Sequence, residues 1–265
     1  MDKDKLIDDA IDAGGDVAGA LVGAGVGAVV AGLPGAVGGA AVGSAAGSVF
    51  KRVAGDIHAR YLSKGESKWV DAVFDAAMRE IERRLGQGDN ARDDGFFDCE
   101  AGDRSTAEEI LEGTLLAAQR EYEEKKLPYM AKLYANIAFD SGVSRPMANR
   151  LIKIASDLTY RQLVIIRIIG MLQIQATILD IRVKKAYGSI SGLTEVSIAS
   201  DIYDLYKSSL VFSSEAMLDA AGVNPSKLTL GGYGALVYNL MELESMELDD
   251  DAADVMRLLV ENFQG

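Results

Sequence analysis

The sequence predicts a mainly helical protein in which a glycine-rich N-terminal segment precedes an acidic helical body. Apolar residues recur at helical spacing over most of the chain after residue 50, and only 4 of the 265 residues are proline. Glycine is frequent, with 28 residues, and follows a fixed period in one segment. We therefore expect four parts: an acidic N-terminal helix (1–16), a glycine-rich segment (17–50), a helical body (51–156) and a helical C-terminal domain (157–265).

The N-terminal helix and the chain as a whole are acidic. Residues 1–16 hold six Asp against two Lys, whereas a cleavable signal peptide begins with basic residues. We therefore expect the glycine-rich segment to remain on the mature protein. The net charge of −13 and the isoelectric point near 4.6 imply repulsion from phosphate backbones, so duplex DNA is not an expected partner.

The glycine-rich segment runs for 34 residues, from Val17 to Phe50, without a charge. Glycine occupies eight of the nine positions that recur every fourth residue between 15 and 47, with Ala31 as the exception. On a helix a four-residue step turns through about 400°, so these glycines form one slanting face, a glycine zipper, on which helix backbones can pack closely. The residues of this face are Gly15, Gly19, Gly23, Gly27, Gly35, Gly39, Gly43 and Gly47.

Pro34 lies midway in this segment and predicts either a helical hairpin, with helices near 17–32 and 35–50, or one kinked membrane helix. The uncharged length exceeds that of a membrane span, and Lys51 with Arg52 would keep the following body cytoplasmic. Membrane insertion, with pore formation by a homo-oligomer, is one interpretation. The alternative is a soluble hairpin whose small-residue faces pack on each other or on another subunit.

The helical body begins with two predicted helices and a loop. Apolar residues at helical spacing predict helices at about 51–62 and 66–86. The stretch 86–104 is rich in Gly and Asp, which is typical of a loop.

Three further helices of the body are marked by their starting residues. Ser105 followed by Glu108 is a capping box, which opens a helix to about Lys126. Pro128 starts the next helix, and Pro146 sits in the first turn of another.

The C-terminal domain is predicted to begin with the longest helix, at about 159–187, with Asp157 or Thr159 near its N-cap. The centre of this helix is apolar nearly all round, but Arg167 and other polar residues interrupt it, so we expect a buried helix rather than a membrane span. From residue 194 the pattern is a helix, two short strands and a helix at 233–245, and with the preceding helix this order resembles a winged-helix module. Its acidic reading helix would repel a DNA groove, which favours protein contact or packing.

The sequence predicts no catalytic or metal centre. The chain has one histidine, His58, and one cysteine, Cys99, whereas catalytic triads and zinc sites need several such residues together. No nucleophile–base pair, carboxylate pair or phosphate loop stands out. We therefore expect neither an enzyme nor a protein with a bound cofactor.

Residues 145–187 are the one basic part of this acidic chain, with eight Lys or Arg against two Asp. Basic residues on adjacent helices can form a pocket for an anionic ligand such as a nucleotide or a short single-stranded oligonucleotide, with an aromatic ring to stack on a base. The alternative is a basic face that pairs with acidic helices of the same chain or a neighbour. The candidate ligand-binding residues are Arg145, Arg150, Lys153, Tyr160, Arg161, Arg182, Lys184 and Lys185.

The architecture resembles the membrane effectors of bacterial abortive anti-phage defence, in which a glycine-zipper segment is joined to a cytosolic helical body. The stretch LPYMAKLYANIAFDSGVSRPMANRLIKIASDLTYRQLVII (127–166) is similar to the cytosolic domain of this group, in particular of channel effectors of the Hailong system. The resemblance implies a homo-oligomeric ion channel in the bacterial inner membrane, gated by a short nucleotide signal from a partner nucleotidyltransferase. The competing expectation is a soluble, cytoplasmic interaction or regulatory protein that assembles through the glycine-rich hairpin.

Overall fold

The computed structural model describes residues 66–98, 104–179, 193–214, 227–248 and 252–255. Over these residues the protein is mainly helical, as predicted. The chain divides into two compact units, Met1–Ser156 and Asp157–Gly265. The predicted N-terminal helix, the glycine-rich segment and the helix at 51–62 lie outside the described residues.

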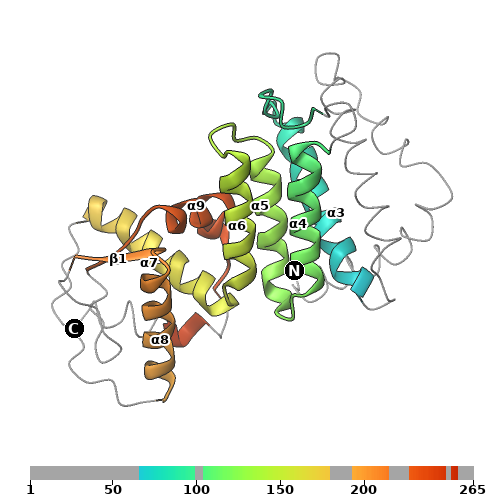
Figure 1. The fold of residues 1–265 in the computed structure, drawn as a ribbon. Coiled ribbons are helices and arrows are strands. Elements are labelled where there is room, and N and C mark those ends of the chain that lie inside the picture. Colours follow the sequence, from blue (N-terminus) through green and yellow to red (C-terminus); the bar gives the residue numbers. More distant parts are fainter. Residues whose placement is uncertain (1–65, 99–103, 180–192, 215–226, 249–251, 256–265) are drawn as a thin grey trace. The chain divides into compact units, whose positions relative to one another are not determined.

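The described part of the first unit is a group of helices (Figure 1). Helix α3 (Glu66–Gly86) has the bounds that its periodicity predicts, and it packs on α4 (Thr106–Gln119) and α5 (Leu127–Ile137). Helix α6 (Arg145–Asp157) lies against α4, because a Cβ built on Gly113 would be 3.5 Å from Ile152 Cδ1. The fully buried core side chains include Val73, Ile110, Leu111, Leu115, Leu133, Ile137, Leu151 and Ala155.

The start of α4 confirms the predicted capping box. Ser105 Oγ accepts a hydrogen bond from the Glu108 amide at 3.1 Å, and the Glu108 carboxylate accepts from the Ser105 amide at 2.7 Å. Both residues are buried. Two amides that the first turn of a helix leaves without a partner are thereby satisfied.

The end of α4 corrects the prediction that this helix continues to Lys126. The helix ends at Gln119 because the Glu121 carboxylate accepts hydrogen bonds from the backbone amides of Tyr122 and Glu123, at 3.0 and 2.9 Å. A continuing helix would bond these amides to carbonyls four residues earlier. A short 3₁₀ turn, η1 (Glu124–Lys126), then leads into α5, which has a proline in its first turn as predicted.

The loop after α3 is held to the helices by one buried arginine. Arg92 Nη1 donates to the carbonyl oxygens of Val143 at 2.9 Å and Ile137 at 3.3 Å, and its guanidinium lies over the Phe96 ring. Asp94 pairs with the same guanidinium. The loop predicted at 86–104 is therefore irregular but anchored over its described residues.

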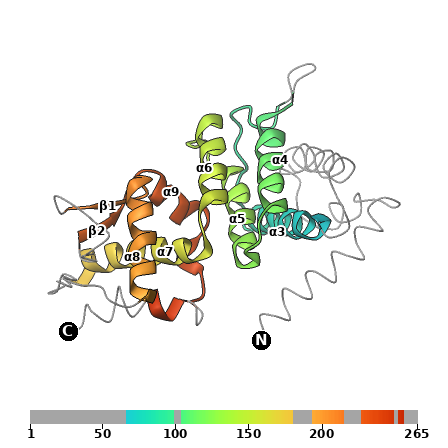
Figure 2. The ribbon, with the colours of Figure 1, turned by 60° about the horizontal axis from the view of Figure 1, so that its bottom comes forward.

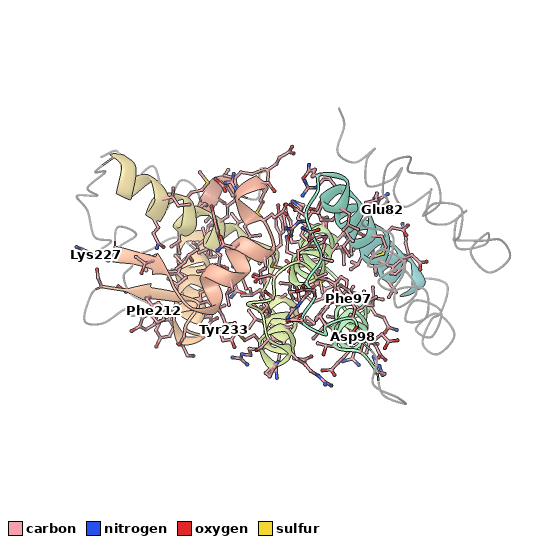
Figure 3. All side chains as sticks on the ribbon, turned by 90° about the horizontal axis from the view of Figure 1, so that it is seen from above. Glu82, Phe97, Asp98, Phe212, Lys227 and Tyr233 are labelled. Atoms are coloured by element: carbon pink, nitrogen blue, oxygen red, sulfur yellow. The ribbon has the colours of Figure 1, made fainter. Side chains whose placement is uncertain are left out.

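The second unit is built around α7 (Tyr160–Leu179), which α8 (Leu193–Lys207) crosses (Figure 2). Two short antiparallel strands follow, β1 (Val211–Ser213) and β2 (Leu228–Leu230), with Phe212 opposite Thr229. Gln173 Oε1 accepts the Leu230 amide at 2.9 Å and so ties β2 to α7. Phe212, labelled in Figure 3, is 44% exposed.

Helix α7 has the cap and the burial that the sequence predicts. Thr159 Oγ1 accepts from the Gln162 amide at 3.2 Å, while the Gln162 side chain accepts from the Thr159 amide at 3.0 Å. Thr159, rather than Asp157, is therefore the capping side chain. The apolar residues that pack this helix into its unit are Leu163, Val164, Ile165, Ile166, Ile168 and Ile169.

Helix α9 (Tyr233–Leu240) is shorter than the predicted helix, which runs on to residue 245. Glu242 adopts a left-handed backbone with φ 51°, and a 3₁₀ turn, η3 (Leu243–Ser245), follows it. An α-helix cannot pass through a left-handed residue, so the chain turns here. No helix among the described residues has both the length and the apolar character of a membrane span.

Candidate functional site

The candidate ligand-binding residues divide between the two units. Arg145, Arg150 and Lys153 lie on α6 in the first unit, and Tyr160 and Arg161 lie on α7 in the second. The remaining three, Arg182, Lys184 and Lys185, lie outside the described residues. The eight glycines of the predicted zipper lie outside them as well.

Helix α6 presents Arg150 and Lys153 to solvent. Its opposite face is buried through Ala148, Leu151 and Ala155, which fixes the direction of the polar face. Both cations are exposed, and no ion pair or hydrogen bond of their side chains is found within the described residues. Residues three apart on a helix are neighbours, so these two charges form one exposed basic patch on α6.

Arg145 has a structural role at the start of the same helix. Its guanidinium pairs with Glu109 on α4, and Asn149 Nδ2 donates to the same carboxylate at 2.6 Å. The hydrogen bond from Arg145 is the main reason that the pKa of Glu109 lies below its ordinary value of 4.5. For Arg145 the alternative interpretation, pairing with an acidic helix of the same chain, therefore describes the structure.

Arg161 and Tyr160 also serve the packing of their unit. Arg161 pairs with Asp201 on α8, and its Nη2 donates to Ser197 Oγ at 2.6 Å. The Tyr160 side chain is buried, with 8% exposed, so its ring is not displayed to stack on a base. Both side chains thus contribute to the packing of the second unit, and their role in ligand binding stays a prediction.

Arg167, also on α7, differs from Arg161 because two of its nitrogens have no hydrogen-bond partner among the described residues. Arg167 Nε and Nη1 are both buried, and neither donates a hydrogen bond within the part of the chain that the structure describes. Each buried polar group without a partner costs about 1–3 kcal/mol, and more when it is charged. Such atoms are rare in folded proteins and call for an explanation, of which a bound ion is one.

Tyr238 on α9 is the polar neighbour of this arginine. Its ring packs on α7 at Gly170, where an added Cβ would be 2.5 Å from Tyr238 Cε2. The hydroxyl is buried and also has no hydrogen-bond partner among the described residues. Burial raises the pKa of Tyr238, as does nearby Glu244, while the positive charge of Arg167 opposes both. Three donor atoms without a partner among the described residues, two of Arg167 and one of Tyr238, therefore lie on contacting helices of the second unit.

The sequence contains a signal for Arg167 but none for Tyr238. Arg167 is a lone charge within LVIIRIIGML, and it was expected only to mark the helix as buried rather than membrane-spanning. A buried charge is expected to be paired or hydrogen-bonded, so the sequence alone raises the question of what Arg167 binds. Tyr238 lies in an ordinary amphipathic helix, and only the fold places it against α7.

Metal binding and known relatives add no further assignment. Within the described ranges, no group of three or more His, Cys, Asp or Glu side chains is arranged to hold a metal ion. Comparison of the chain with known protein families, curated proteins and solved structures finds no match.

Proposed function

We propose that the chain is a membrane effector of bacterial anti-phage defence, which forms an oligomeric ion channel or pore gated by its helical body. In this proposal residues 17–50 form a helical hairpin or a kinked helix in the inner membrane. The body lies in the cytoplasm and senses a nucleotide or oligonucleotide signal. The observation that carries the proposal is the glycine register from Gly19 to Gly47 within the uncharged segment 17–50, since small residues at this spacing let helices associate in lipid.

Two features of the described residues support a sensing body. Arg150 and Lys153 form an exposed basic patch on a protein of net charge −13, and such a patch attracts phosphate groups. The order of α8, β1, β2 and α9 supports a small winged-helix-like part, which in this proposal mediates protein contact rather than DNA binding.

The test of the membrane half compares the full chain with a chain that lacks residues 17–50. Only the full chain is expected to sediment with membranes and to depolarise cells when the activating infection is supplied. Leu substitutions at Gly23, Gly27, Gly39 and Gly43 should abolish depolarisation because leucine prevents close helix packing. Matched substitutions of the glycines that lie out of register, Gly25, Gly32 and Gly38, should leave more activity. Equal depolarisation by both sets would refute the zipper.

The test of the sensing half reverses the charge of the α6 patch. Arg150→Glu with Lys153→Glu should remove the response to the signal without lowering stability, because both side chains are exposed. Arg120→Glu with Lys227→Glu changes the charge equally at exposed positions elsewhere and serves as the control. A response that survives the α6 reversal would contradict a role for this patch.

A soluble oligomeric interaction or regulatory protein is the second candidate. The same glycine register favours it, because a face of small residues also lets two helices approach closely when hairpins pack on each other or on another subunit. In that case the full chain would fractionate with the cytosol and would purify as an oligomer without detergent.

A further inference from the structure

The Arg167 guanidinium and the Tyr238 hydroxyl remain without an explanation in the fold. Arg161, which lies six residues before Arg167 on α7, has both an aspartate and a serine as partners. Arg167 Nε and Nη1, by contrast, have no hydrogen-bond partner among the described residues although both are buried. A shortage of acids is not the reason, since the chain has 40 Asp and Glu against 27 Lys and Arg.

The packing of α9 and β2 on α7 fixes the position of the Tyr238 ring relative to the helix that carries Arg167. Leu230 and Tyr238 both close on α7 at Gly170, where an added Cβ would meet Leu230 Cδ1 at 3.0 Å and Tyr238 Cε2 at 2.5 Å. Only a residue without a side chain permits this approach. Gly170 lies three residues after Arg167 and therefore on the same side of the helix. The Tyr238 ring is thus held against the part of α7 that carries Arg167, and its hydroxyl is close enough for the charge of the arginine to lower its pKa.

The chemistry of the two groups selects an anion. A guanidinium offers hydrogen-bond donors in a planar fork and no acceptor, and a phenol can add one more donor. Phosphate and carboxylate oxygens match this fork, and the bonds are strengthened by charge. Arg167 as a residue is half-buried, whereas its Nε and Nη1 are buried, so an anion bound to these two nitrogens would be largely shielded from water.

We propose that Arg167 and Tyr238 bind one phosphate group, and that this is a contact of the second unit with the signal of the proposed function. The choice of phosphate over other oxyanions rests on that proposed function. The existence of an anion site rests only on the unmade donors and their packing.

The test measures binding of inorganic phosphate to the purified full chain by ³¹P line broadening and by the rise of the thermal midpoint. Arg167→Met removes the charge and the donors but keeps an unbranched chain, and it should weaken phosphate binding about 10-fold or more. Tyr238→Phe removes only the hydroxyl and should weaken binding several-fold. Arg120→Met, at an exposed position outside the site, loses the same charge and should bind as the natural chain does.

A second measurement keeps the test decisive if a variant is unstable. Without phosphate, Arg167→Met should unfold no earlier than the natural chain, because it removes a buried charge that has no partner. If Arg167→Met instead lowers the midpoint equally with and without phosphate, the arginine has a partner within the chain and the proposal is wrong. Gly170→Ala, which displaces the Tyr238 ring without removing a donor, should weaken binding as Tyr238→Phe does.

Three further outcomes test the choice of phosphate and separate this inference from the proposed function. Acetate that binds as tightly as phosphate, through the same residues, would overturn the assignment to phosphate. A chain that binds phosphate through Arg167 but does not sediment with membranes or depolarise cells would leave the site intact and refute the channel. A chain that depolarises cells but binds no phosphate would support the channel and refute the phosphate site.

Discussion

Replacing Lys126 with methionine is expected to destabilise the first unit by about 3–5 kcal/mol. The Lys126 ammonium forms an ion pair with Glu121, and the two side chains are only 2% and 5% exposed. Lys126 Nζ also lies 3.4 Å from the Ser156 carbonyl oxygen, at the end of α6. Methionine fills a similar space but leaves the Glu121 carboxylate buried without its counter-charge.

The loss can be measured by urea unfolding followed through Trp69, the only tryptophan in the chain, which lies on α3 in the same unit. With a urea dependence of about 2 kcal/mol per molar, a loss of about 4 kcal/mol lowers the midpoint by about 2 M. The slope should stay unchanged because the same surface is exposed on unfolding. Arg120→Met, an exposed substitution with the same charge change, should shift the free energy of unfolding by no more than about 0.5 kcal/mol.

A double variant separates the buried charge from the packing of the side chain. Glu121→Gln keeps the oxygen that accepts from the amides of Tyr122 and Glu123 but removes the charge. Combined with Lys126→Met, it should return the free energy of unfolding to within about 1 kcal/mol of the natural chain, because no unpaired charge remains. A single Lys126→Met variant that loses less than about 1 kcal/mol would refute the reasoning. So would a double variant that is as unstable as the single one.

Two further predictions test other contacts. Gly234→Ala would place its Cβ 1.9 Å from the Leu210 carbonyl oxygen and should lower the free energy of unfolding by about 3 kcal/mol or more. Gly113→Ala on α4 meets only Ile152 Cδ1, at 3.5 Å, and should raise the free energy of unfolding by about 0.5–1 kcal/mol. Equal effects of the two variants on the thermal midpoint would contradict this geometry. The pKa of Glu109 is lowered mainly by its hydrogen bond from Arg145, so this pair stabilises the fold above the ordinary pKa of 4.5 and the stabilisation is lost as the pH falls through the lowered value. Urea midpoints across that range should show a smaller acid loss for Arg145→Met than for the natural chain.

Local rules predicted helix starts better than helix ends. The bounds of α3 follow from apolar spacing, and the starts of α4 and α5 follow from Ser105 and Pro128, whose capping geometry is contained within a few residues. The end of α4 depends on a side chain that competes with the helix for its own backbone amides. The end of α9 depends on a left-handed glutamate, Glu242, that no composition rule marks.

The count of charged residues located the basic part of the chain but could not predict which carboxylate each basic residue pairs with. Arg145 and Arg161 find their carboxylates 36 and 40 residues away along the sequence. Only the fold reveals that these pairs form, since the sequence gives the number of acids and not their positions in space. For the same reason the sequence could not predict that Tyr238 lies near Arg167, because a helix and two strands separate α9 from α7 along the chain.

In the proposed site, Arg167 links the stability of the second unit to a ligand. If an anion satisfies Arg167 only when bound, the folded unit is stabilised by the binding free energy, which reaches about 2.7 kcal/mol at a ligand concentration 100 times the Kd. Arg167 lies one residue from Ile166 and Ile168, both buried, and three residues from the point where α9 closes on α7. An anion there would strengthen the packing between α7 and α9 rather than add a contact at the edge. Under the proposed function, a signal that binds this pair would therefore change how firmly the two helices hold together, and such a change could gate the channel.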